Sequence, residues 1–301
     1  MLAVIRGAGD IASAVALRLW RSGIGVIMTE VARPLTVRRT VAFSEAVRLG
    51  KAQVEGVVAE RASSTSHALE LLGHEGVVPV LVDPCCTCLE AGPDVLVDAI
   101  LAKRNTGTSM DMAPVVIGVG PGFTAGADCH AVVETMRGHT LGRVYYEGSA
   151  LPNTAVPGLV GGFAGERVLR APCEGVFREV AQIGDHVESG QVVAYVAWTP
   201  VVEGVPAVGE APVVGGAPAV GETPVVATIS GVLRGLIAGG THVTRGLKCG
   251  DVDPRDDASF CRLVSDKGLA VAGGVLEAIL HLNGTFSGIP KIPKTCEVKR
   301  T

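Results

Sequence analysis

Residues 2–30 read LAVIRGAGDIASAVALRLWRSGIGVIMTE, and this stretch decides the predicted fold. Two β-branched runs, 2–6 and 25–29, are typical of buried strands, and Ile11–Arg21 between them is typical of a helix. Gly7, Gly9 and Ala12 form a G-x-G-x-x-A pattern after the first strand. There the glycines allow a tight turn and the close approach of a pyrophosphate, and a small third residue packs helix on strand. Glu30 ends the second strand, where an acid would hold a ribose hydroxyl. The stretch therefore predicts a nucleotide site, and survival of the fold without a ligand is the alternative.

The same alternation of strands and helices continues to about residue 168. The expected strands are Val54–Glu60, Val77–Val82, Val95–Ile100, Val115–Val119 and Arg143–Tyr146, and the expected helices are Ser44–Gly50, Ser64–Leu72 and Ala127–Arg137. Nearly all-apolar strands between helices are typical of a parallel sheet that is covered on both faces. Residues 1–168 are therefore expected to form an α/β, Rossmann-like nucleotide-binding domain.

A repeat marks a second part of the chain, residues 169–255. Gly175-Val176-Phe177-Arg178 recurs as Gly231-Val232-Leu233-Arg234, and the glycines expected in β-turns recur with it. The repeat resembles the two halves of a barrel-sandwich hybrid of the biotinyl/lipoyl type, which predicts a small all-β domain. Another small all-β fold is the alternative. No lysine occurs between Lys103 and Lys248, so neither biotin nor lipoate is expected.

Three shorter segments complete the expected organisation. Residues 200–223 contain a tandem repeat, PVVEGVPAVGEA followed by PVVGGAPAVGET, whose prolines are typical of an exposed, flexible loop. Residues 256–284 are expected to form a C-terminal helix over Asp256–Leu282 that closes the β domain. Residues 285–301 are expected to be a tail.

Composition restricts the class of protein. The 301 residues carry 26 basic and 30 acidic side chains, a net charge of −4, which argues against nucleic-acid binding. No apolar run reaches the ~18–20 residues that span a bilayer, and the N-terminus lacks the features of a signal peptide. Eight cysteines are too sparse for a disulfide scaffold. A cytoplasmic protein with reduced thiols and no membrane partner is expected.

A second glycine loop supplies further candidate residues. Gly120 and Gly122 follow the strand at 115–119 and lead into an expected helix whose first turn holds Asp128 and His130. A histidine there suits general acid or base catalysis, whereas the alternative is that Asp128 caps the helix and His130 packs. Lys103 follows another strand, and ligands bind at the carboxyl ends of parallel strands. Asp128, His130 and Lys103 are therefore the catalytic candidates, and whether the chain is an enzyme stays open.

Cys85, Cys86 and Cys88 stand together in the sequence. A metal clip, a persulfide or a selenium carrier would use such thiols, and structural thiols are the alternative. Adjacent cysteines suit tetrahedral zinc poorly, and no second cysteine pair or histidine pair completes a ligand set. No metal site is predicted.

Several stretches together resemble one family. They include GAGDIASAVALRLWRSG, VDAILAKRNTGT, APVVIGVGPGFTAG, HAVVETMRGHTLGRVYYEGSA, GDVDPR and SDKGLAVAGGVLEAIL. In this order they are similar to the YqeB-type accessory proteins of selenium-dependent molybdenum hydroxylase systems. The resemblance implies a maturation role, with the hydroxylase apo-enzyme or other maturation factors as partners. It also implies functional roles for Gly7, Gly9, Glu30, Arg38, Arg39, Asn105, Gly120, Gly122, His130 and Asn153. The cysteine cluster and the expansion at 200–223 depart from the family pattern.

These observations predict a maturation factor that binds NAD(P) or a dinucleotide form of the molybdenum cofactor. Both ligands carry a pyrophosphate, so the glycine loop does not distinguish them. Arg33, Arg38 and Arg39 follow Glu30, so the ligand could carry a 2′-phosphate, and the alternative is that these arginines form a solvated surface. The alternative is a stand-alone NAD(P)-dependent oxidoreductase that uses His130 as acid or base near Lys103.

Overall fold

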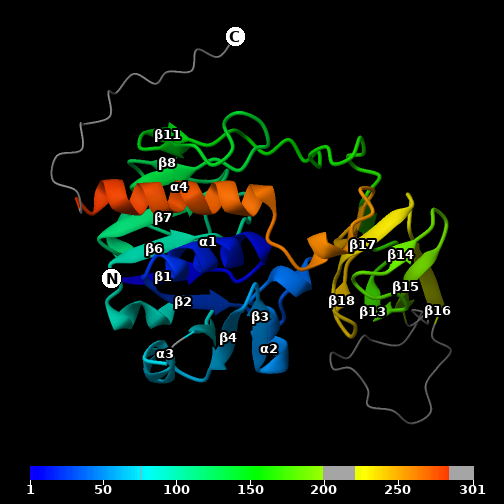
Figure 1. The fold of residues 1–301 in the computed structure, drawn as a ribbon, viewed down its shortest axis with the longest axis horizontal. Coiled ribbons are helices and arrows are strands. Elements are labelled where there is room, and N and C mark those ends of the chain that lie inside the picture. Colours follow the sequence, from blue (N-terminus) through cyan, green and yellow to red (C-terminus); the bar gives the residue numbers. More distant parts are fainter. Residues whose placement is uncertain (75, 199–220, 285–301) are drawn as a thin grey trace, which may run out of the picture.

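A nine-stranded sheet forms the centre of the computed structural model, which describes residues 1–74, 76–198 and 221–284 (Figure 1). Across the sheet the strands are β10 (Val144–Tyr145), β9 (Ala131–Val133), β7 (Val115–Val119), β6 (Val95–Asp98), β1 (Leu2–Arg6), β2 (Gly25–Glu30), β5 (Val77–Val82), β4 (Val57–Ala62) and β3 (Lys51–Val54). The seven strands from β9 to β4 pair in parallel, whereas β10 with β9 and β3 with β4 are antiparallel. The sheet is therefore mixed, and the predicted parallel, Rossmann-like layout is wrong.

Two local features explain this correction. The run expected to be one strand, Val54–Glu60, is interrupted by Glu55 and Gly56, whose φ angles of 46° and 88° turn it into the β3–β4 hairpin. The helix expected over Ala127–Arg137 does not form, because Ala131–Val133, which includes two β-branched valines, is buried as strand β9 beside β7. Consequently no α-helix follows β7 directly along the chain.

Helices cover the two faces of the sheet unequally. On one face, α1 (Asp10–Arg21) lies beside α4 (Asp266–Leu282), and α2 (Glu45–Leu49) contributes to the same core (Figure 1). The other face is covered by α3 (Thr65–Leu72), the 3-10 turn η2 (Thr87–Ala91) and the two-stranded sheet of β8 (Thr124–Ala125) and β11 (Gly148–Ser149). The chain's last described helix thus occupies the place that a crossover helix after β7 would have filled.

The C-terminal helix differs from its expected bounds and position. It begins at Asp266 rather than Asp256, because Ser265 caps it by accepting a hydrogen bond from the backbone N–H of Gly268. The residues before it include the 3-10 turn η4 (Ala258–Cys261). Its buried face contacts α1 and the strands β7, β9 and β10. The helix therefore packs on the central sheet and does not close the β domain.

Two four-stranded antiparallel sheets form a second lobe. One contains β12 (Val168–Arg170), β19 (Lys248–Asp253), β17 (Gly231–Leu236) and β14 (His186–Val187), and the other β16 (Gly221–Val226), β15 (Val192–Trp198), β13 (Gly175–Glu179) and β18 (His242–Val243). Their inward side chains share one core that includes Phe177, Val196, Leu233 and Val252. This β lobe is a pair of open sheets, so the predicted barrel-sandwich layout is also corrected. We call the rest of the described chain the α/β lobe.

Two of the predicted segments lie outside the described residues, namely most of the 200–223 insertion and the 285–301 tail. The predicted domain bounds, 1–168, 169–255 and 256–284, stay predictions. No helix within the described ranges combines the length and the apolar character needed to cross a membrane.

Candidate functional site

The first glycine loop is closed by hydrogen bonds from its own surroundings. The amide of Gly7 donates to the carbonyl of Thr29 at 2.9 Å, and the amide of Ala8 donates to Glu30 Oε2 at 2.8 Å. Glu30 Oε1 accepts from the amide of Val31 at 2.9 Å. Glu30 was predicted to hold a ribose hydroxyl. Its carboxylate instead accepts a hydrogen bond from the Ala8 amide, which was predicted to face a pyrophosphate.

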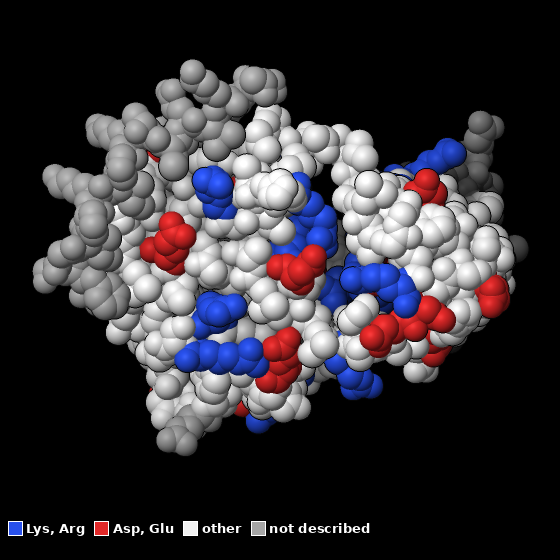
Figure 2. All heavy atoms as spheres, turned by 45° about the horizontal axis from the view of Figure 1, so that its top comes forward, with Lys and Arg blue, Asp and Glu red and all other residues white. Residues whose placement is uncertain are grey.

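A cavity of about 720 Å³ opens beside this loop, between the α/β lobe and the β lobe. Figure 2 shows basic side chains gathered where the two lobes meet. Of the described residues that line the cavity, seven are basic and four are acidic. The site residues predicted from the sequence that line it are Gly7, Gly9, Ala12, Glu30, Arg38, Lys103 and Asn153.

Asn105, Asp128 and His130 make structural contacts away from the cavity wall. The Asn105 amide donates to Asp128 Oδ1 at 3.2 Å and to the carbonyl of Thr108 at 2.8 Å. Asp128 Oδ2 accepts from the amide of Thr124 at 2.8 Å, and His130 Nδ1 accepts from the amide of Val116 at 3.0 Å. These contacts brace loops and strands, and they do not bring the three side chains together with Lys103.

Gly120 and Gly122 bear on the cavity indirectly, through the backbone. Both have positive φ, 83° and 111°. A Cβ added at Gly122 would lie 2.6 Å from the backbone of Arg104, and one at Gly120 would lie 2.8 Å from Thr135 Oγ1. Glycine at 122 therefore lets the loop that carries Lys103 approach closely.

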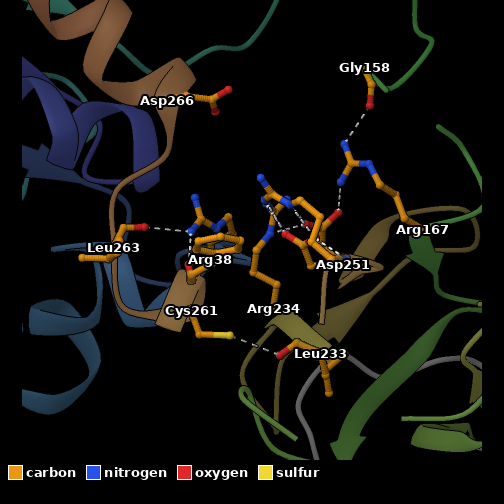
Figure 3. Close-up of polar contacts among 12 residues, drawn as sticks. Arg38, Gly158, Arg167, Leu233, Arg234, Asp251, Cys261, Leu263 and Asp266 are labelled. Atoms are coloured by element: carbon orange, nitrogen blue, oxygen red, sulfur yellow. Dashed lines mark hydrogen bonds and ion pairs between the residues drawn. The ribbon is translucent and has the colours of Figure 1, made fainter. Parts of the chain in front are cut away.

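Three arginines, which come from both lobes, line one side of the cavity. Figure 3 shows their side chains grouped together, with Asp266 of α4 above them. Arg38 is 8% exposed; its Nη2 donates to the carbonyls of Phe260 and Leu263 at 2.9 and 3.1 Å. Arg167 is also 8% exposed and Arg234 is 7% exposed. We call Arg38, Arg167 and Arg234 the arginine cluster.

One buried carboxylate serves several of these cations. Asp251 accepts hydrogen bonds from both Arg167 and Arg234, and Lys248 Nζ lies 3.6 Å from Asp251 Oδ1. Arg234 Nη1 also pairs with Asp253 Oδ2 at 3.0 Å. Burial alone would raise the pKa of Asp253, but hydrogen bonds from Arg255 and the charges of Arg234 and Arg255 more than offset this, so that pKa is lowered.

The arginine cluster is incompletely compensated. Burial lowers the pKa of Arg38, and Arg234 adds to the lowering while Asp10 opposes it. Burial likewise lowers the pKa of Arg167, against the attraction of Asp251. Within the described residues, the Nε atoms of Arg38 and Arg167 are buried and have no hydrogen-bond partner. Buried polar groups normally find such partners, so these two guanidinium groups are incompletely hydrogen-bonded within the fold.

Two lysines reach the cavity from the α/β lobe. Lys103 lies in the loop after β6, and Lys267 lies in the first turn of α4. Burial lowers the pKa of both, and for Lys267 the charges of Lys103 and Arg137 lower it further. Arg137 itself is paired with Asp266 through two contacts, at 2.7 and 3.1 Å.

Much of this wall escaped prediction from the sequence, namely Arg137, Arg167, Arg234, Lys248, Asp251 and Lys267. The sequence contained one signal for these residues. Asp251 and Asp253 are two positions apart in a strand and therefore lie on the same face of it. Acidic side chains on a buried strand face need cations as partners. Arg234 also has a repeat counterpart, Arg178, which is exposed and pairs with Glu222 at 2.9 Å. The repeat alone does not tell which of the two arginines is buried.

The cysteine cluster lies on the opposite face of the central sheet from α1 and α4. Cys86 and Cys88 are buried there, Cys85 is exposed, and all three are free thiols. The amide of Cys88 donates to Asp83 Oδ2 at 2.8 Å. In the part of the chain that is described, no group of three or more His, Cys, Asp or Glu side chains is placed to hold a metal ion.

Comparison with known proteins gives one relative by sequence. No family model matches the chain. It is 48% identical over 282 residues to "Uncharacterized protein YqeB" of Escherichia coli (strain K12), a match that covers 93% of this chain and 48% of that protein. The chain thus spans about half the length of this curated relative.

Solved structures give weaker likenesses. An aspartoacylase family protein from Mesorhizobium loti MAFF303099 shares 15% identity over 83% of this chain and 84% of that chain, with a TM-score of 0.25. A succinylglutamate desuccinylase/aspartoacylase from Rhodobacter sphaeroides shares 12% identity over 83% and 86%, also with a TM-score of 0.25. These TM-scores do not establish a shared fold, and they assign a role to no residue.

The predicted function is wrong. It was a maturation factor that binds NAD(P) or a dinucleotide form of the molybdenum cofactor, with an NAD(P)-dependent oxidoreductase as the alternative. The glycine loop on which nucleotide binding depended is closed by its own surroundings, because the Ala8 amide donates to Glu30 and the Gly7 amide donates to the carbonyl of Thr29.

The resemblance to YqeB-type proteins does not depend on the predicted function. Over the half of YqeB that it spans, the chain is similar to a protein whose description assigns no activity. The predicted resemblance to YqeB is therefore confirmed over that half of its length, without a function.

Proposed function

We propose that the chain binds a small organic anion, one that carries a carboxylate or phosphate group, in the cavity between its two lobes. The observation that carries this proposal is the arginine cluster: Arg38, Arg167 and Arg234 all line this cavity, and they are only 8%, 8% and 7% exposed. Buried cations gathered on one wall are unfavourable until an anion lies against them.

The charge balance of the cavity wall supports an anion over a neutral ligand. Asp251 is shared by Arg167, Arg234 and Lys248, and Asp253 is shared by Arg234 and Arg255, so two carboxylates face four cations. An anion at this place would satisfy the remaining guanidinium hydrogens in a low-dielectric setting, where charge-assisted hydrogen bonds are strong. Guanidinium groups suit the planar oxygens of a carboxylate and the oxygens of a phosphate equally.

The test is calorimetric titration of the full chain with citrate and with inorganic phosphate at constant ionic strength, with glucose as the neutral probe. We expect saturable binding of at least one anion and none of glucose. Arg167→Met should weaken that binding about tenfold or more, because it removes a charge-assisted hydrogen bond. Its matched control is Lys51→Met, since Lys51 is exposed on edge strand β3 and pairs with Glu60 at 2.9 Å.

Two outcomes decide against the proposal. One is the absence of saturable anion binding by the wild-type chain, and the other is an Arg167→Met variant that folds and binds as the wild type does. If Arg167→Met fails to fold, Lys248→Gln replaces it, because this side chain is 42% exposed and still lines the cavity.

A further inference from the structure

Lys267 enters the cavity from a rigid element. It occupies the first turn of α4, a helix of 17 residues whose N-cap, Ser265, accepts from the Gly268 amide at 3.1 Å. The helix packs along α1 over the central sheet (Figure 1). The Lys267 side chain is partly buried and lines the same cavity as the arginine cluster. A group on such a scaffold is held in a reproducible position.

The groups that face Lys267 leave its amine without an ion pair. Arg137 is engaged with Asp266, and both oxygens of Glu134 accept backbone amides, those of Thr135 and Met136 at 2.7 Å and that of Leu151 at 2.8 Å. Asp10 Oδ2 lies 3.8 Å from Arg38 Nη1. Among the described residues no carboxylate comes within ion-pair distance of Lys267 or Lys103.

This setting favours the neutral amine. Burial contributes most to the lowered pKa of Lys267, the cations Lys103 and Arg137 add to it, and the attraction of Asp10 and Glu134 does not compensate. A desolvated lysine beside a second cation is the environment in which lysine becomes a nucleophile.

The second lysine, Lys103, is held in place by its loop. Leu101 and Lys103 both have positive φ, 61° and 64°, which L-residues seldom adopt without surrounding constraint. The constraint begins where the loop leaves β6, because Asp98 is buried and accepts from Arg6 Nη1 at 3.1 Å and from Thr108 Oγ1 at 2.6 Å. A braced loop thus keeps a second cation in the wall of the cavity that Lys267 lines.

From this arrangement we infer that Lys267 forms a Schiff base with a carbonyl compound whose anionic group lies on the arginine cluster. The inference rests on the proposed anion binding and narrows the ligand to an oxo acid or a phosphorylated carbonyl compound. Lys103 acts as a positioning residue, since it influences the amine of Lys267 through its charge.

The step balances without an oxidant or a reductant. The Lys267 nitrogen forms a bond to the carbonyl carbon while the π pair moves to the oxygen, which takes up a proton. The nitrogen then gives up a proton, the hydroxyl group accepts one and leaves as water, and the C=N bond forms. In sum, the ammonium form of Lys267 and the carbonyl compound give a protonated imine and one water molecule. These protons are exchanged with water, to which the cavity is open.

The experiment traps the imine. The full chain is incubated with pyruvate and sodium cyanoborohydride, followed by intact-mass measurement and peptide mapping. We expect one reduced pyruvyl adduct, on Lys267, and about tenfold less modification with acetone, which has the carbonyl group but no carboxylate for the arginines. Lys267→Arg, which keeps the charge but cannot form an imine, should abolish the adduct.

The pH profile separates the role of Lys103 from a merely structural one. Lys103→Gln should move the trapping profile to higher pH, because loss of the neighbouring charge raises the pKa of Lys267. The matched control, Lys51→Gln, should leave the profile unchanged. An unshifted profile in Lys103→Gln would refute the assigned role.

The outcomes keep this inference distinct from the proposed function. If citrate and phosphate fail to bind the wild-type chain, the proposed function falls and this inference falls with it. If they bind but pyruvate labels no lysine, or labels surface lysines to the same extent in wild type and Lys267→Arg, only the Schiff-base inference is overturned.

Discussion

The protein around Lys267 opposes a positive charge on its amine. Its neighbours in the cavity wall include Lys103 and Arg137, and burial removes part of its hydration. A conformation that disfavours the ammonium form must be stabilised by the rest of the fold, here by the packing of α4 on α1. Such locally unfavourable groups gather at functional sites.

The depressed pKa of Lys267 predicts how stability depends on pH. The folded-state pKa lies below 10.5, so between the two values the unfolded chain binds more protons and stability rises with pH. We expect Lys267→Met to show a smaller rise than the wild type as the pH increases toward about 10. Urea unfolding midpoints across that range measure this. Equal pH slopes in both proteins would contradict the prediction, and the remaining slope in the variant should reflect Lys103, whose pKa is lowered too.

At the scale of the element, α4 owes its position to one of two adjacent glycines. Gly274 faces the loop before β10, where an added Cβ would overlap the carbonyl oxygen of Gly142. Gly273 faces solvent, and a Cβ there would meet nothing within 4 Å. Only Gly274 is thus required for the close approach that seats the helix on the sheet.

This difference predicts opposite effects of the same substitution. Gly273→Ala should stabilise the chain by about 0.5–1 kcal/mol, because alanine loses less backbone freedom in a helix. Gly274→Ala should destabilise it by about 1–3 kcal/mol through overpacking. Thermal unfolding of both variants provides the comparison. Effects of equal sign would show that α4 is seated differently.

At the scale of the whole molecule, one contact between the two lobes is made at η1 (Arg39–Val41), which lies against β17. Arg39 Nε donates to the carbonyl of Leu236 at 2.7 Å, and its Nη2 pairs with Glu179 at 2.5 Å. The amide of Leu236 donates to the carbonyl of Val37 at 2.9 Å. Since the arginine cluster draws on both lobes, this contact also sets the geometry of the cavity.

Arg39→Met should therefore weaken the junction. We expect a loss of about 1–2 kcal/mol in unfolding free energy, given that the ion pair is only partly buried, together with weaker anion binding. Denaturant unfolding and the citrate titration measure the two effects. Arg178→Met is the control, because Arg178 is exposed and pairs with Glu222 inside the β lobe. A junction variant that unfolds and binds as the control does would refute the role given to Arg39.

Prediction from the sequence succeeds where local pattern and burial coincide. Ile11–Arg21 carries an apolar face and is observed as Asp10–Arg21, and Val77–Val82 and Val115–Val119 are observed as strands. Prediction fails at 127–137, where a helix was expected. The pairing of residues 131–133 with β7 stabilises a strand there more than helix propensity stabilises a helix. That pairing is a tertiary contact, and no local pattern contains it.

What the sequence by itself determined is the set of short-range elements and the glycine loop, because periodicity and turn residues act over a few positions. The family resemblance also needed only the sequence. What the tertiary structure decided is the site. Its cations come from separate elements of the two lobes, namely Lys103, Arg167, Arg234 and Lys267. These side chains become buried only when those elements pack together, and burial is what makes an uncompensated charge unfavourable.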